Sequence, residues 1–385
     1  MADFTRAQKS PIDATAWPAV AAVPMPRGGS VRTKLAEAAF ARACAKAGLA
    51  LEGESPDLTV ERAEVFQRVA ARGWTGLAEG YMAGEWSTTS SQVLVDDLVA
   101  LVDAGYRPVS PRPSAVPGGR RPVGAAGELP PDLTQHFAGS VASHAQGHFG
   151  TGVPTTERTR VKSHTPGAGR GNEPSHHFMD VTDIGAPLDA HRDDLTDAQL
   201  RSVAMLLEAA STNAGTHLLE MPCSGGAVVT QAVAKRITVD TVSFDERIAR
   251  GVEEQLIMAG AEGSARVDLL SSTAEIPELA HQRRGVYDAV VSMNAFEALP
   301  AAEQTAYLQA AEEMLAPGGR VAVQTIVRTG AFSRAAGAAL TSLRPYSWPR
   351  LNVVTVDDID RLVDKNTGLR VTAVTTAPEH LAASL

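Results

Sequence analysis

Apolar residues recur along the chain with two different patterns, and the pattern changes near residue 196. Before this point helical spacing dominates, as in the apolar face formed by Val65, Phe66 and Val69. The spacing predicts three helices, over residues 31–49, 60–72 and 93–102. Together these helices predict a small helical N-terminal domain over residues 31–106.

From residue 196 onward, short apolar runs alternate with amphipathic stretches. Thr196 with Gln199 forms a capping-box pattern at a predicted helix start, and Thr355 with Asp358 forms another. Strands are predicted over residues 217–221, 237–242, 267–270, 287–293, 320–327 and 370–376, with helices such as 245–259 and 303–315 between them. This alternation predicts an α/β fold with a doubly wound, mostly parallel sheet over residues 175–385. Ligands of such sheets bind at the carboxyl ends of the strands.

Two other segments lack a regular pattern. Residues 1–30 hold four prolines and a Gly-Gly pair, which predicts a flexible arm. Residues 107–174 hold ten of the 23 prolines and carry a net charge of +4, whereas the rest of the chain carries −13. We expect a mostly irregular linker there. It is either a solvated connection or a basic segment close to anionic lipid headgroups.

Charge and composition narrow the class of protein. The net charge of −9 argues against nucleic-acid binding, which needs a clustered basic surface. Cys44 and Cys223 are the only cysteines, so no disulfide framework is expected and the reducing cytoplasm is the default location. No secretory signal or apolar run of membrane-spanning length is visible, and no metal site is expected.

The first strand of the predicted sheet runs into the loop Glu220-Met221-Pro222-Cys223-Ser224-Gly225-Gly226. This loop matches neither the nicotinamide-binding G-x-G-x-x-G pattern nor a P-loop. It resembles motif I of class I methyltransferases, E-x-G-x-G-x-G, whose glycines let the backbone approach S-adenosylmethionine. Pro222 and Ser224 stand at the first two glycine positions, and Gly226 at the third.

Later strands strengthen the resemblance. The stretch 287–292, YDAVVS, resembles the fourth strand of that fold, and 315–320, LAPGGR, resembles the turn into its fifth strand. The second strand ends in Thr241, Val242 and Ser243, where the cofactor ribose is expected. The resemblance therefore implies S-adenosylmethionine as cofactor, with these candidate binding residues: Glu220, Pro222, Cys223, Ser224, Gly226, Thr241, Val242, Ser243, Glu246 and Met293.

Two stretches point to one family within this fold. Residues 76–86, GLAEGYMAGEW, resemble a string of the N-terminal helical domain of the cyclopropane fatty acid synthases. Residues 292–298, SMNAFEA, resemble the family's SxGxFEH. Shorter echoes lie at 324–326, 346–349 and 176–182. The chain thus resembles a diverged member of the cyclopropane-fatty-acyl-phospholipid and mycolic acid cyclopropane synthases.

That resemblance implies lipid chemistry. The family adds a methylene from S-adenosylmethionine across a cis double bond of an acyl chain, usually in a phospholipid. The reaction passes through a carbocation, so it needs a dry apolar slot, and then a base that removes a proton. The family holds bicarbonate as that base. Glu297 matches the family's bicarbonate-site Glu, Gln324 stands at its His position, and Phe296 and Tyr346 are expected to line the acyl slot.

The chain departs from the family pattern at several of these positions. Motif I has lost two glycines, and Gln324 replaces the His. The short segment 184–195 has no counterpart of the family's site Cys, and after His380 no counterpart is seen of the late helix that brings its Tyr. Of the side chains that would hold bicarbonate, only that of Glu297 is matched.

Three functions remain open from the sequence. The first is methyl or methylene transfer to unsaturated acyl chains of membrane lipids by a cytoplasmic protein, with peripheral association to the inner membrane face as an open alternative. The second is a catalytically degenerate paralogue, acting as a partner or regulator, in a homodimer or with another protein. The third is a methyltransferase acting on another substrate. Purely structural roles are open for three of these residues. Glu220 could serve only to shape its loop, Cys223 could be a small buried residue that fills space, and Glu297 could serve only to cap a helix.

Overall fold

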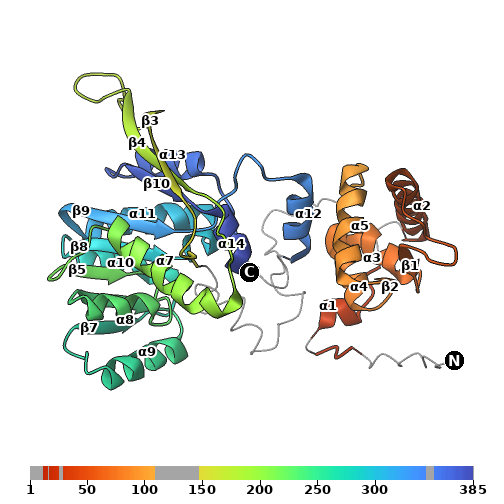
Figure 1. Ribbon diagram of the computed structural model, residues 1–385, viewed down its shortest axis with the longest axis horizontal. Coiled ribbons are helices and arrows are strands. Elements are labelled where there is room, and N and C mark those ends of the chain that lie inside the picture. Colours follow the sequence, from red (N-terminus) through yellow and green to blue (C-terminus); the bar gives the residue numbers. More distant parts are fainter. Residues whose placement is uncertain (1–11, 16, 26–28, 109–146, 344–350, 385) are drawn as a thin grey trace. The chain divides into compact units, whose positions relative to one another are not determined.

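The computed structural model describes residues 12–15, 17–25, 29–108, 147–343 and 351–384, and Tyr346 lies outside them. The chain divides into two compact units. The helical unit is Met1–Thr134 with Gly330–Pro349, and the sheet unit is Gln135–Thr329 with Arg350–Leu385 (Figure 1). Among the described residues, no helix combines the length and the apolar character needed to cross a bilayer.

The helical unit contains the three predicted helices, now with observed bounds: α2 (Gly29–Ala47), α3 (Glu64–Arg72) and α5 (Ser91–Asp103). It also contains elements that the sequence pattern did not predict: α1 (Pro18–Ala21), α4 (Trp74–Met82), and the antiparallel pair β1 (Leu58–Val60) and β2 (Trp86–Thr88). A distant segment completes it, because α12 (Arg334–Leu343) packs against α4 and α5. Its core is built from residues of α2, α3, α4, β2 and α5, among them Phe40, Val65, Leu77, Trp86 and Leu101.

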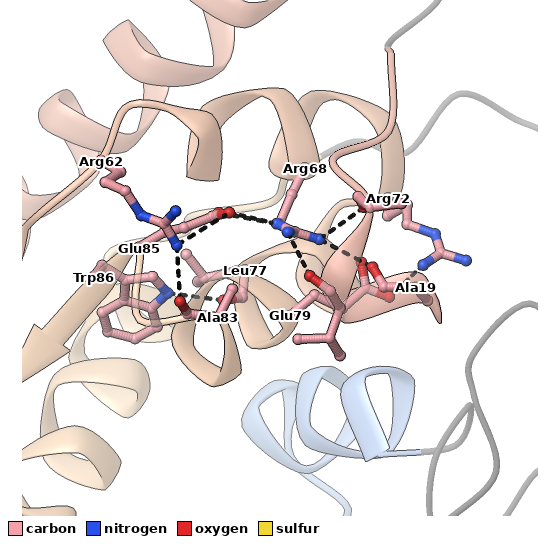
Figure 2. Close-up of polar contacts among 11 residues, drawn as sticks. Ala19, Arg62, Arg68, Arg72, Leu77, Glu79, Ala83, Glu85 and Trp86 are labelled. Carbon is pink, nitrogen blue, oxygen red and sulfur yellow. Dashed lines mark hydrogen bonds and ion pairs between the residues drawn. The ribbon is translucent and has the colours of Figure 1, made fainter. Parts of the chain in front are cut away.

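A buried arginine joins three parts of the helical unit (Figure 2). Arg68 is 1% exposed, and its Nε lies 2.9 Å from both carboxylate oxygens of Glu85. Its two terminal nitrogens donate to the carbonyl oxygens of Ala19, Val20 and Ala22, at 2.7 to 3.2 Å. The expectation of a loose arm over residues 1–30 is therefore wrong for α1, which the guanidinium ties to α3.

The residues of the 76–86 stretch have packing roles in this unit. A Cβ at Gly76 would lie 2.1 Å from the carbonyl oxygen of Arg68, so only glycine allows α4 to approach α3 this closely. The indole Nε1 of Trp86 donates to the carbonyl of Leu77 at 2.8 Å, and the buried Glu79 pairs with Arg72. The stretch is thus explained by the folding of the helical unit.

The sheet unit is built on five parallel strands in the order β7-β6-β5-β8-β9, which confirms the predicted doubly wound α/β fold. The strands are β5 (His217–Glu220), β6 (Thr238–Ser243), β7 (Ala265–Leu269), β8 (Tyr287–Met293) and β9 (Leu315–Gln324). One face is covered by α7 (Leu195–Ala209), α8 (Ala227–Ala234) and α9 (Glu246–Met258). The other is covered by α10 (Ile276–Gln282), α11 (Ala301–Met314) and α13 (Val356–Asn366) (Figure 1).

A second, three-stranded sheet corrects two expectations. β3 (Pro154–Lys162) and β4 (His176–Ile184) form an antiparallel hairpin, so the predicted irregular linker over 107–174 is wrong for residues 154–162. β10 (Ala373–Thr376) pairs in parallel with β4. The predicted last strand therefore belongs to this smaller sheet instead of the main one. α14 (Pro378–Ser384) follows it.

The two predicted helix caps differ in outcome. At α13, Thr355 and Asp358 form the capping box, and the two side chains bond each other's backbone N–H at 3.1 Å. At α7 the prediction is wrong, because the helix begins at Leu195 and Thr196 lies inside it. A short 3₁₀ turn, Arg192–Asp194, leads directly into α7 and makes a separate cap at Thr196 unnecessary.

Substitution of Glu85 tests whether the buried ion pair supports the helical unit. Glu85→Ala leaves the Arg68 guanidinium buried without its carboxylate, so we expect a loss of about 3 kcal/mol in the free energy of unfolding. Denaturant unfolding followed by tryptophan fluorescence measures it, because the four tryptophans of the chain belong to this unit. Glu37→Ala, at an exposed position of α2, should cost less than about 0.5 kcal/mol. Equal losses in the two variants would contradict this role.

Candidate functional site

The strand order reverses between β5 and β8, and sheets of this kind bind their ligands at the carboxyl ends of the strands beside such a reversal. The loop after β5 lies there. Gly225 and Gly226 have φ values of +74° and +102°, which side chains with a Cβ rarely adopt. The N–H of Cys223 donates to the carbonyl oxygen of Val242 at 2.7 Å, and the Tyr307 hydroxyl donates to that of Met221 at 2.8 Å. The loop is thus held from β6 and from α11.

Glu220 lies inside this loop and is 0% exposed. One carboxylate oxygen accepts from the Ser224 N–H at 2.9 Å and from the Ser224 hydroxyl, and the other accepts from the Thr241 hydroxyl at 2.7 Å. Burial raises the pKa of Glu220, although these three donors oppose the shift. The observed hydrogen bonds of this carboxylate fix the loop at Ser224 and connect it to Thr241 of β6.

The other cofactor candidates are brought to the same edge of the sheet. Val242, Ser243 and Met293 are at most 2% exposed, and the Ser243 hydroxyl donates to the carbonyl of Asp245 at 2.9 Å. Glu246 is 71% exposed and pairs with Arg250 at 2.8 Å. Pro222 is half-buried. Cys223 is buried, which raises the pKa of its thiol to about 12, a value that suits a filler better than a nucleophile.

Phe296 and Glu297 form a short turn directly after β8. Phe296 is 1% exposed and its ring packs edge-on against Tyr307, with centroids 6.0 Å apart. Glu297 is 5% exposed, and its carboxylate accepts from the Thr325 hydroxyl at 2.7 Å. Burial outweighs this bond and raises the pKa of Glu297 to about 7. A carboxyl group with this pKa can hold or release a proton near neutral pH.

Gln324 ends β9 beside this turn. Its side-chain oxygen accepts from the hydroxyl of Ser202 at 3.0 Å, and Ser202 is a buried residue of α7. The N–H of Asn352 donates to the carbonyl oxygen of Glu297 at 2.6 Å. Sequence reasoning missed Ser202, Thr325 and Asn352, since each is an ordinary polar residue whose partner is set by tertiary contacts.

Asn294 lies between β8 and the Phe296–Glu297 turn with a φ of +51°. Its N–H donates to the carbonyl oxygen of Gln324 at 2.8 Å, so this conformation continues the pairing of β8 with β9. Among residues with a Cβ, asparagine tolerates the left-handed region well. Asn294 stands where the family string has glycine, so the structure explains why this replacement is compatible with the turn.

Comparison with known proteins identifies the family. A family profile described as mycolic acid cyclopropane synthetase matches residues 184–385. The chain belongs to this family. Its members are S-adenosylmethionine-dependent enzymes that modify lipids, and the resemblance drawn from the sequence is confirmed.

Three proteins are among those similar to the chain. "Tuberculostearic acid methyltransferase UfaA1" of Mycobacterium tuberculosis (strain ATCC 25618 / H37Rv) is 25% identical over 97% of this chain and 84% of its own length. The solved cyclopropane synthase MmaA2 of Mycobacterium tuberculosis is 18% identical, with a TM-score of 0.38, over 45% of this chain. The mycolic acid cyclopropane synthase CmaA1, solved with SAH and CTAB, is 21% identical, with a TM-score of 0.37, over 44%. The chain covers 61% of each of these solved chains.

The loop after β5 keeps part of what the family's cofactor requires. Gly225 and Gly226 have positive φ values, so the loop can turn as a glycine-rich motif does. The side chain of Gln255 fills the space beside Gly226, because a Cβ there would lie 2.5 Å from its oxygen. Thr241 is enclosed with Glu220, whereas Glu246 is exposed and pairs with Arg250.

The left-handed conformation of Asn294 predicts an unusual order of stabilities. Asn294→Ala should be less stable than Asn294→Gly by about 1 kcal/mol, because alanine is strained at positive φ. Thermal or denaturant unfolding of the pair measures this order. Ala339 is an exposed position of α12, and there the order should reverse, so that Ala339→Gly is less stable than the protein with alanine. If Asn294→Ala were more stable than Asn294→Gly, the left-handed conformation of this residue would be contradicted.

The burial of Glu297 predicts a specific pH dependence. The unfolded chain releases this proton near pH 4.5 and the folded protein near pH 7, so folding retains a proton between them. The free energy of unfolding should therefore fall by about 3 kcal/mol as pH rises through this window, over and above other groups. Glu297→Gln should lack this component in denaturant unfolding at several pH values, whereas the exposed Glu254→Gln should keep it. Parallel curves for wild type and Glu297→Gln would refute it.

Proposed function

We propose that this protein transfers the methyl group of S-adenosylmethionine to a cis double bond in an acyl chain of a membrane phospholipid and releases a methylene-branched chain. Membership of the cyclopropane synthetase family supports the cofactor and the lipid. A relative that aligns along nearly the whole chain is named as a methyltransferase of tuberculostearic acid, which favours branching over ring closure. The observation that carries the proposal is the buried Glu297 carboxyl beside Phe296.

Bound S-adenosylmethionine would supply the methyl group and depart as S-adenosylhomocysteine, and the alkene carbon that does not receive the methyl group would carry the positive charge. Phe296 and the neighbouring apolar residues favour this step by keeping water from the cation. A hydride shift then places the positive charge on the carbon that bears the new methyl group. Glu297 accepts a proton from that methyl group, and the electron pair of the broken C–H bond forms a C=CH2 double bond at the branch carbon. With a pKa near 7, Glu297 can take up this proton and later release it to water.

The surroundings of Glu297 favour direct proton acceptance over the use of bicarbonate. Gln324 stands where the family has His, and its amide oxygen is bonded to Ser202. An amide does not accept a proton near neutral pH. The Thr325 hydroxyl holds one carboxylate oxygen of Glu297 and so fixes its direction. These contacts make Glu297 the base that the site itself provides.

Expression in a host without its own synthase, followed by proton NMR of the extracted lipids, tests the product. Signals of the two vinylic protons of a branching C=CH2 group are expected, and they are distinct from those of a cyclopropane ring. In the purified protein, kcat should rise with pH up to about 7. Glu297→Gln should lower kcat by about 10²-fold or more without changing the affinity for S-adenosylmethionine. Glu254→Gln is the matched control.

The other outcomes are equally specific. Cyclopropane signals would overturn the branched product and restore the ordinary family reaction. Calorimetry that detects no binding of S-adenosylmethionine at millimolar concentration would overturn the enzyme and favour a non-catalytic paralogue. Turnover of cofactor without any change in the lipids would indicate a different methyl acceptor.

A further inference from the structure

The helical unit contains a hollow that the reaction described above does not use. It has a volume of about 440 Å³ and lies where α12 meets the end of α5 and the start of α4. The Thr75 hydroxyl donates to the carbonyl oxygen of Thr341 at 3.1 Å and holds α12 in place. Its lining residues within the described part of the chain all belong to this unit, although residues 332–341 are far in sequence from the others.

The wall of the hollow is mostly apolar. Most of it comes from the side chains of Trp74, Val102, Tyr106 and Phe332. On α12, Gly337 has no side chain to project into the hollow. Trp74 and Tyr106 pack edge to face, with ring centroids 5.5 Å apart, which gives a rigid aromatic floor. Phe332 is 36% exposed. Trp74 is partly exposed as well, whereas Val102 and Tyr106 are 6% exposed, and removal of the exposed apolar part from water would favour an apolar ligand.

A stripe of valines extends the apolar surface along α5. Val95 and Val99 are 54% and 41% exposed, and they share a helix face with Val102, which lines the hollow. The hollow is therefore continuous with exposed apolar side chains on the same helix. An elongated apolar ligand would cover both.

Two positively charged side chains, Arg107 and Arg334, lie at the hollow and bear on the charge of the ligand that it could bind. Arg107 and Arg334 both line it and are exposed. Within the described part of the chain, neither guanidinium has a hydrogen-bond or ion-pair partner, and no carboxylate lines the hollow. Elsewhere acidic residues prevail, since the whole chain carries a net charge of −9. A local pair of unpaired cations in an acidic protein favours an anionic ligand.

We propose that this hollow binds one acyl chain of an anionic phospholipid, with its headgroup at Arg107 and Arg334. Its volume is that of a small-molecule site and is too small for a helix of a partner protein. The apolar wall accounts for the chain and the two guanidinium groups for the phosphate. The site would attach the helical unit to a lipid surface. It is independent of the proposed reaction and would bind lipid even in an inactive protein.

Co-sedimentation of the full chain with vesicles tests the charge. We expect binding to phosphatidylglycerol vesicles that is at least about tenfold tighter than to phosphatidylcholine vesicles. The double variant Arg107→Glu with Arg334→Glu should lose this preference, whereas Arg42→Glu on the exposed face of α2 should not. Equal binding to both vesicles, or an unchanged double variant, would overturn the proposal.

Tryptophan quenching tests the acyl chain. Phosphatidylglycerol with a brominated acyl chain should quench Trp74, and Trp74→Phe should remove most of the quenching, whereas Trp86→Phe should not. Gly337→Leu should fill the hollow, since a Cβ there lies 3.7 Å from the Phe332 ring, and should abolish the quenching. Ala339→Leu adds the same bulk on the exposed side of α12 and should leave it intact. Quenching that survives Gly337→Leu would place the lipid elsewhere. Calorimetry with S-adenosylmethionine, run on the same variants, separates this result from any failure of the proposed cofactor site.

Discussion

The carboxylate of Glu220 accepts three hydrogen bonds, and the path of the loop after β5 depends on them. They join the end of β5 to its own loop and to β6. A carboxylate removed from water is costly unless its oxygens are bonded, so the loop must keep the path that supplies these donors. Ser224 stands where the family motif has glycine, and its hydroxyl also accepts from the Val228 N–H at 3.2 Å at the start of α8. Ser224 thus gives up the conformational freedom of glycine and adds side-chain hydrogen bonds that fix the loop.

Two carboxyl groups lie at this edge of the sheet, and burial raises the pKa of both. Glu220 is 0% exposed and accepts hydrogen bonds from Ser224 and Thr241 on its two oxygens, so its contacts serve the fold. Glu297 accepts from the Thr325 hydroxyl and from the backbone N–H groups of Glu297 and Ile326, but burial outweighs these bonds and raises its pKa to about 7. A carboxyl group with this pKa is suited to proton transfer near neutral pH.

The sequence predicts the main sheet well because each strand there is a short apolar run between helical stretches. β8 occupies the predicted residues 287–293. The pattern fails where other factors decide. α4 was not predicted, since glycines and aromatics obscure its helical period, and β3 is almost wholly exposed and shows no apolar alternation. The pairing of β10 with β4 is nonlocal, so nothing within residues 370–376 could reveal it.

The same distinction applies to the candidate sites. A short motif predicts Phe296 and Glu297, because adjacent residues at a strand end stay together in the fold. It does not predict Ser202 or Thr325, which reach Gln324 and Glu297 from other elements. The 76–86 stretch shows the opposite case, in which a recognisable string has a structural use around Arg68 and Glu85. Sequence similarity therefore identifies both the 76–86 stretch and the Phe296–Glu297 turn. The contacts of each side chain then decide whether it supports the fold or is available to a ligand.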